Sequence, residues 1–139
     1  MKIALTLINF PEKCIPKEWR IEHNIKLLEV DRRCEALEAI LEFNNNDNRD
    51  LKKLLSTFKI QLRSKKILHE GSRLSKYSAN KEILEFKSNR GHSRLFGFLS
   101  ENSGSIIICT NGYWKTTGKK AKQDAAFRRA DTLRNLYFD

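Results

Sequence analysis

Residues 81–114, KEILEFKSNRGHSRLFGFLSENSGSIIICTNGYW, alternate apolar and polar side chains over much of their length, and two polar clusters interrupt the pattern. A period of two is typical of strands, and NRGH and ENSG are turn sequences. The stretch therefore predicts a β-meander of three strands, Lys81–Ser88, Ser93–Ser100 and Ser105–Trp114. The isoleucines at 106–108 leave the last strand without a polar face, so we expect it to be central and buried on both sides.

The sequence before the meander follows a helical period. RRCEALEAILEF, residues 32–43, places apolar residues on one helix face, and Asp31 can cap it. The polar run NNNDN ends this helix, and Asn48 or Asp47 can cap a second one, whose apolar residues are Leu51, Leu54, Leu55, Phe58 and Leu62. Strands are expected earlier, at Lys2–Phe10 and Ile25–Val30. Residues 11–23 are interpreted as a loop or short helical turn, and residues 64–80 as a loop.

The sequence after the meander, residues 118–136, predicts a basic helix. Its inner stripe is Ala126, Ala130, Leu133 and Tyr137, and Thr117 can cap it. Together these elements predict an α+β fold in which a small antiparallel sheet, the meander, packs against an N-terminal helical hairpin and carries a C-terminal helix. The length of 139 residues predicts a single domain, of which the first 30 residues are the least characteristic part.

The composition is that of a folded protein, with 40% hydrophobic and 32% charged residues. The longest apolar run is too short to cross a bilayer and the N-terminus lacks a signal-peptide pattern, so we expect a cytoplasmic protein without a membrane partner. Cys14, Cys34 and Cys109 are widely spaced and form no CxxC pair. They are interpreted as ordinary thiols, with Cys109 as a small core residue, and no metal or cofactor is expected.

The positive charge is confined to the later part of the chain. Residues 1–50 hold 8 Lys or Arg and 10 Asp or Glu, whereas residues 51–139 hold 19 and 7, a net charge of +12. Such a field attracts polyanions, so nucleic acid or an acidic protein is the leading partner. The simpler alternative is a solvated basic surface.

Ionisable side chains gather around the turn between the first two meander strands. Residues two apart on a strand share a face, so Glu85 projects with Lys87, and Arg94 lies on the side of Phe96 and Phe98. Antiparallel order brings the end of the third strand to the same end of the sheet. The predicted cluster consists of Lys87, Arg90, His92, Arg94 and Lys115.

Such a cluster could cleave a phosphodiester. Attack by a ribose 2′-hydroxyl on its own phosphate needs a base, cations for the growing negative charge, and an acid for the leaving 5′-oxygen. Lys87 or His92 could be the base, Arg94 and Arg90 the charge stabilisers, and Lys115 a stabiliser or the acid. Tyr113, Trp114 or His92 could stack on an RNA base. The predicted RNA-binding residues are Arg90, Tyr113, Trp114, Lys119, Lys120, Lys122 and Arg128.

Each of these residues also has a structural interpretation. Arg94 could pair with Glu85 across the strands, and His92 could be a turn residue. Lys87 could be solvated, and Trp114 could cap the core.

The C-terminal half resembles the RelE/ParE toxin superfamily, and within it the HigB-like toxins of phage-derived toxin-antitoxin systems. ILEFKSNRGHSRLFGFL is similar to the family's Glu-containing strand, short turn and Arg-bearing strand. IIICTNGYWKTTGKKAKQDAAFRRAD is similar to its apolar strand, aromatic residue, Lys-Thr and basic helix. The resemblance covers roughly residues 31 to 139.

The resemblance implies a ribonuclease that cuts mRNA on the ribosome and is held inactive by an antitoxin with a helix-turn-helix domain. It implies that Arg94 contacts the scissile phosphate and that Lys115, Lys87 and His92 line the same groove. The stretch KKAKQDAAF lacks the Tyr or His that members often place by the last helix as acid or base. The alternatives are therefore a ParE-like poison of DNA gyrase that cleaves nothing, or a nucleic-acid or partner-binding module without chemistry.

Overall fold

The computed structural model describes residues 3–11, 25–63, 75–77, 83–88, 90–99, 106–116 and 120–138, with backbone alone for 58–63 and 75–77. The elements in chain order are β1 (Leu5–Asn9), β2 (Ile25–Val30), α1 (Glu35–Asn46), α2 (Asn48–Arg63), β3 (Ser75–Tyr77), β4 (Leu84–Lys87), β5 (Ser93–Leu99), β6 (Ile107–Trp114) and α3 (Lys120–Phe138). Within the described ranges, no helix is both long and apolar enough to cross a membrane.

The strands form one mixed six-stranded sheet with the order β1-β2-β6-β5-β4-β3. The α+β class and the antiparallel meander β4-β5-β6 are confirmed. The expectation of an entirely antiparallel sheet is wrong, because β2 pairs with β6 in parallel. A parallel pair needs a long crossover connection, and the helical hairpin and the first two meander strands supply it here.

Two elements differ from the sequence prediction: an unpredicted strand, β3, and a later start of α1. β3 lies in the predicted loop 64–80 and pairs with β4, and its three residues are too few to show a period. The first helix starts at Glu35 rather than Arg32, because Asp31 and Arg32 have φ values of 49° and 68° in a turn that pairs Val30 with Arg33. Asp31 does not cap the helix; its carboxylate accepts a hydrogen bond from the backbone N–H of Ala4 (2.9 Å).

The other caps and loops can be placed only in part. Asp47 caps α2, because its carboxylate accepts from the backbone N–H of Arg49 (3.0 Å). The predicted cap Thr117 and all of the predicted loop 11–23 except Pro11 lie outside the described residues.

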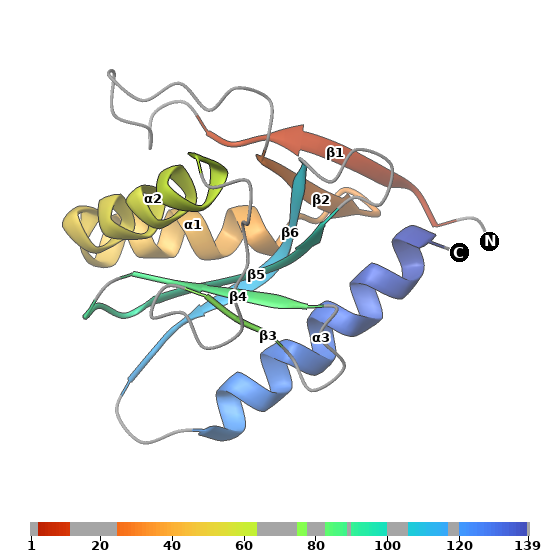
Figure 1. Ribbon diagram of the computed structural model, residues 1–139. Coiled ribbons are helices and arrows are strands. Elements are labelled where there is room, and N and C mark those ends of the chain that lie inside the picture. Colours follow the sequence, from red (N-terminus) through yellow and green to blue (C-terminus); the bar gives the residue numbers. More distant parts are fainter. Residues whose placement is uncertain are drawn as a thin grey trace.

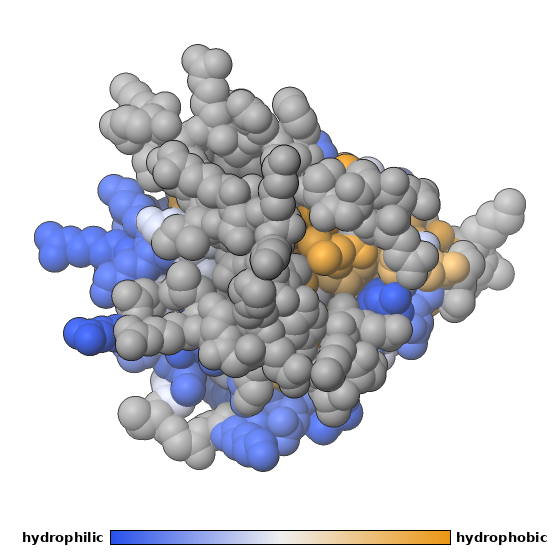
Figure 2. Space-filling view, in the orientation of Figure 1, coloured by the Kyte–Doolittle hydropathy of each residue, from blue (hydrophilic) through white to orange (hydrophobic). Residues whose placement is uncertain are grey.

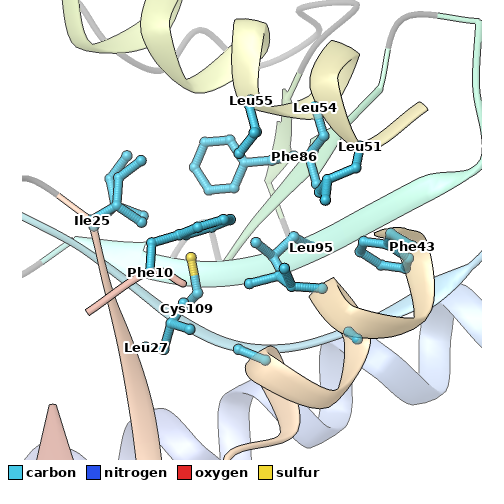
Figure 3. Packing of buried hydrophobic residues seen from close by; sticks show 14 of the residues in the cluster. Phe10, Ile25, Leu27, Phe43, Leu51, Leu54, Leu55, Phe86, Leu95 and Cys109 are labelled. Carbon is cyan, nitrogen blue, oxygen red and sulfur yellow. The ribbon is translucent and has the colours of Figure 1, made fainter. Parts of the chain in front are cut away.

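Helices cover both faces of the sheet (Figure 1): α1 and α2 lie on one face and α3 on the other. The core under α1 and α2 includes Leu51, Leu54 and Leu55 of α2, which point toward Phe86 and Leu95 of the sheet (Figure 3). The core under α3 joins Phe96 and Phe98 to the inner stripe of that helix. Ala126, Ala130 and Leu133 of the predicted stripe are buried, and Tyr137 packs against them partly buried. Each helical layer therefore has its own apolar core.

A β-bulge in β6 decides which of its residues face α3. Ile107 and Ile108 are fully buried on opposite faces, which confirms the prediction of a central strand. The register with β5 then shifts, since Phe96 pairs with Asn111 and Gly97 with Cys109, and Thr110 is the extra residue. Thr110 is held by its hydroxyl, which lies 2.7 Å from Oδ1 of Asn111 and 3.3 Å from the carbonyl of Phe96. The bulge therefore brings Tyr113 to the same face as Ile108, toward α3.

The carboxylate of Asp50, in the first turn of α2, holds the turn between β4 and β5. One oxygen accepts from the backbone N–H of His92 (2.7 Å) and the other from that of Ser93 (2.9 Å). A Cβ on Gly91 would collide with Ser88 Oγ and with this carboxylate, so the turn needs glycine there. Burial by itself raises the pKa of Asp50, but hydrogen bonds from Ser88, His92 and Ser93 outweigh it and hold the pKa below its ordinary value.

We expect Asp50→Asn to lower the free energy of unfolding at neutral pH by roughly 2–4 kcal/mol, because the new amide group would face backbone N–H donors. Since the folded-state pKa of Asp50 is lowered, its contribution is complete above the unfolded-state pKa of about 3.9 and is lost as pH falls through the folded-state pKa. The variant should therefore lose less stability than the wild type on acidification, as measured by urea unfolding at a series of pH values.

The matched control is Glu42→Gln, an exposed position on α1 that should change stability little. Wild-type stability of Asp50→Asn at neutral pH would contradict this role for the carboxylate.

Candidate phosphate-binding site

Three of the candidate side chains form a row across the end of the sheet. Lys87 of β4 lies opposite Arg94 of β5, and Arg94 lies opposite Tyr113 of β6. Directly opposed residues on antiparallel strands project from the same face, here the face that α3 covers. We call these three residues the cationic row. It confirms the prediction that the end of the third meander strand meets the turn between the first two.

Arg94 is the central residue of the cationic row and is only 8% exposed. Its Nη1 donates to the backbone carbonyls of Gly91 and Ser93, each at 3.0 Å. Among the described residues, no carboxylate lies within ion-pair distance of its guanidinium, so the alternative pair with Glu85 is not formed. A nearly buried guanidinium without a carboxylate partner is suited to bind an anion such as phosphate.

Glu85 lies behind the cationic row and is fully buried. Its Oε1 accepts from Nε2 of Gln123 on α3 (2.9 Å) and lies 3.8 Å from Nζ of Lys87. Its Oε2 is buried and has no hydrogen-bond partner in the described part of the chain. Glu85 was not among the predicted catalytic residues, although the strand period correctly placed it on the same face as Lys87.

Tyr113 completes the row as a half-buried phenol. Burial, with smaller contributions from the negative charges of Glu85 and Asp124, raises the pKa of Tyr113 to about 12, while the positive charge of Arg94 opposes the shift. The phenol therefore keeps its proton at neutral pH. It can donate a hydrogen bond or a proton, and it is poorly suited to act as a base.

The first half of α3 closes over this part of the sheet. Besides the bond from Gln123 to Glu85, Asn111 Nδ2 donates to the carbonyl of Ala126 (3.1 Å), and Phe127 packs edge-on against Phe96 at 4.9 Å. Hydrophilic residues gather over this half of the helix along the lower edge of Figure 2. Of the predicted RNA-binding residues, those that the structure places exposed on α3 are Lys120, Lys122 and Arg128. Lys119 lies outside the described residues.

His92 and Trp114 do not join the cationic row. Their rings stack at 4.8 Å with an interplanar angle of 16°, and Trp114 lies 6.1 Å from Phe43 of α1 on the other side of the sheet. Trp114 thus packs against the core, as the structural alternative expected. The predicted single cluster is therefore divided into the cationic row and a second group, the His92–Trp114 stack.

The two groups still share one end of the sheet. The backbone N–H of Lys115 donates to the carbonyl of His92 (2.7 Å), so the end of β6 is tied to the β4–β5 turn. The side chains of Lys115 and Arg90 are exposed beside this junction. The thiols contribute nothing here: Cys34 and Cys109 are buried in the core, burial raises the pKa of both, and Cys14 lies outside the described residues.

We expect Tyr113→Phe to change stability at alkaline pH in particular. Because the folded-state pKa of Tyr113 is raised to about 12, the folded protein holds this proton more tightly than the unfolded chain does. The protonated phenol therefore contributes to the stability of the folded state. This contribution is complete below the unfolded-state pKa of about 10 and is lost as pH rises through the folded-state pKa. The variant should therefore show a flatter decline in melting temperature above about pH 10. Tyr137→Phe, which leaves Tyr113 in place, should keep the wild-type decline; identical profiles for all three proteins would refute the assignment.

Comparisons with models of known families, with curated proteins and with solved structures found no significant match to this chain. Its function must therefore be argued from its own residues. The most informative of these are the cationic row, the carboxylate of Glu85 behind it, and the basic helix above it.

Proposed function

We propose that this protein is the toxin of a bacterial toxin-antitoxin system, a RelE-like endoribonuclease that cuts mRNA on the ribosome. The observation that carries the proposal is the guanidinium of Arg94, which is 8% exposed and has no carboxylate partner among the described residues. Such a group costs free energy to bury unless an anion compensates it. Its neighbours in the row are a second cation and a protonated phenol.

The residues of the site can be assigned to the steps of 2′-hydroxyl attack. Arg94 binds the non-bridging oxygens of the scissile phosphate, and the charge of Lys87 stabilises the negative charge that develops on them. In this assignment Lys87 serves as a cation, with its Nζ 3.8 Å from Oε1 of Glu85.

Proton transfer is assigned to the two remaining groups. Glu85 takes the proton of the 2′-hydroxyl through Oε2, the oxygen without a partner in the described part. The oxygen so released attacks phosphorus, the bond to the 5′-oxygen breaks, and Tyr113 supplies the proton to that leaving oxygen. The products are a 2′,3′-cyclic phosphate and a 5′-hydroxyl. This assignment gives the site the acid that the sequence of α3 lacks.

The ribosomal substrate and the partner rest on the resemblance and on charge. The net charge of +12 on residues 51–139 favours binding to RNA and association that weakens with salt. The same charge favours an acidic surface on the inhibitor, which in this proposal is a helix-turn-helix antitoxin.

A ParE-like poison of gyrase is the second candidate. It is favoured by helix α3, which lies over the cationic row. Glu85 is fully buried and is bonded to Gln123 of α3, so substrate reaches its carboxylate only if the helix gives way. A protein that acts by binding gyrase needs no such access. Inducing the protein separates the two candidates: a DNA-damage response with intact mRNA supports the poison, whereas cuts within translated codons support the nuclease.

Arg94→Ala should reduce mRNA cleavage in a translating extract by roughly 100- to 1,000-fold, the usual effect of removing one group that stabilises transition-state charge. Arg94→Lys should recover only part of the activity, because lysine lacks the bidentate geometry. The readout is the mapping of new 5′ ends within translated codons.

Arg33→Ala provides the control, because Arg33 is an exposed arginine paired with Glu38. This variant should cleave mRNA like the wild type. Cleavage by Arg94→Ala at the wild-type rate would exclude the proposed site.

A further inference from the structure

Hydrogen bonds and ring stacking fix the position of His92 in the His92–Trp114 stack. His92 is exposed, yet its backbone N–H is bound by Asp50 (2.7 Å) and its carbonyl by Lys115 (2.7 Å). Its Nδ1 lies 2.7 Å from the carbonyl oxygen of Lys115, which can only accept, so Nδ1 carries the proton. One ring face lies on Trp114, and the exposure of the side chain leaves the other face open to solvent. The imidazole is therefore a fixed aromatic surface.

The residue at the tip of the same turn is strained. Arg90 has a φ of 56°, in the left-handed region that costs a residue with a side chain about 1–2 kcal/mol, and it is exposed. Glycine or asparagine would adopt this conformation at lower cost. Residues held in such conformations are common at binding and active sites. The arginine side chain projects from the turn that carries His92.

From these two features we infer that the β4–β5 turn is a second RNA subsite: one unpaired nucleobase stacks on the open face of His92, and Arg90 contacts a phosphate of the same strand. Aromatic rings bind exposed bases in this way without reading their identity. Arg94 connects the two subsites, because its Nη1 is bonded to the carbonyl of Gly91, the residue between Arg90 and His92. The inference rests on the proposed function and adds the nucleotide that flanks the scissile phosphate.

The test uses the full chain and a short single-stranded 2′-O-methyl RNA that contains 2-aminopurine, which can bind but cannot undergo 2′-hydroxyl attack. Binding to the wild type should quench the fluorescence of the 2-aminopurine. His92→Phe should preserve both affinity and quenching, whereas His92→Ala should lose the quenching and about 5- to 100-fold in affinity. Against a backbone of the same length without bases, wild type and His92→Ala should bind equally.

The outcomes separate the two proposals. If His92→Ala binds the RNA as tightly as the wild type while Arg94→Ala binds weakly, the stacking subsite is refuted and the cationic row stands. If the wild type does not bind the RNA, the stacking subsite is refuted, whereas the proposed function fails only if Arg94→Ala cuts mRNA in the translating extract like the wild type. Circular dichroism confirms folding, and His92→Leu, apolar but without an aromatic face, replaces the alanine variant if that one is unfolded.

Arg90→Gly should make the protein more stable and a weaker RNA binder. Relief of the strained φ should raise the melting temperature by about 2–6 °C. Loss of one phosphate contact should reduce the slope of log affinity against log salt by about 0.7.

Arg32→Gly is the matched control, because Arg32 has a φ of 68° in the turn after β2. It should gain similar stability and keep the wild-type salt dependence. A stabilised Arg90→Gly with an unchanged salt slope would show that Arg90 does not contact the RNA.

Discussion

The hydrogen bonds that the carboxylate of Asp50 accepts from the β4–β5 turn are the constraint on which the candidate site depends. They fasten the start of α2 to the backbone of His92 and Ser93, and so they fix where β5 begins. The residue after Ser93 is Arg94, whose place opposite Lys87 and Tyr113 follows from that register. A slip of one residue would turn Arg94 toward the core under α1 and α2. One buried carboxylate therefore connects the helical hairpin to the residues that would bind phosphate.

Much of the fold could be predicted because its elements show a regular spacing of apolar residues within short stretches of sequence. The strand Ile25–Val30 and the two amphipathic helices follow patterns that a short window detects, and so does the meander. The parallel pairing of β2 with β6 could not be predicted, because the sequence of a strand does not indicate which other strand it pairs with. β3 could not be predicted either, since three residues show no alternation.

The site was less accessible to prediction than the fold, and the reason lies in contacts between distant residues. Lys87 and Arg94 were found because their faces follow from the strand period. Asp50 was missed because its partners lie 42 and 43 residues further along the chain, and nothing in its own helix marks it. The bulge at Thr110 reverses the alternation within β6, so the faces of Tyr113 and Trp114 could not be deduced by counting from the isoleucines. His92 was expected beside Arg94 because both lie at the β4–β5 turn, but its ring stacks on Trp114, which packs against the core under α1 and α2.

The division of the predicted cluster resolves an electrostatic difficulty of the original prediction. Lys87, Arg90, His92, Arg94 and Lys115 gathered on one face would repel one another, and that repulsion would destabilise the folded state in the absence of a ligand. In the structure, Lys87 is compensated by Glu85, and Arg94 is bonded to two carbonyls. Arg90 and Lys115 extend into solvent, where water screens their charges. Only Arg94 combines burial with the absence of a carboxylate partner among the described residues, so an incoming phosphate gains most from that one group. In the proposed function, the rest of the basic surface would guide RNA toward it without a comparable cost in stability.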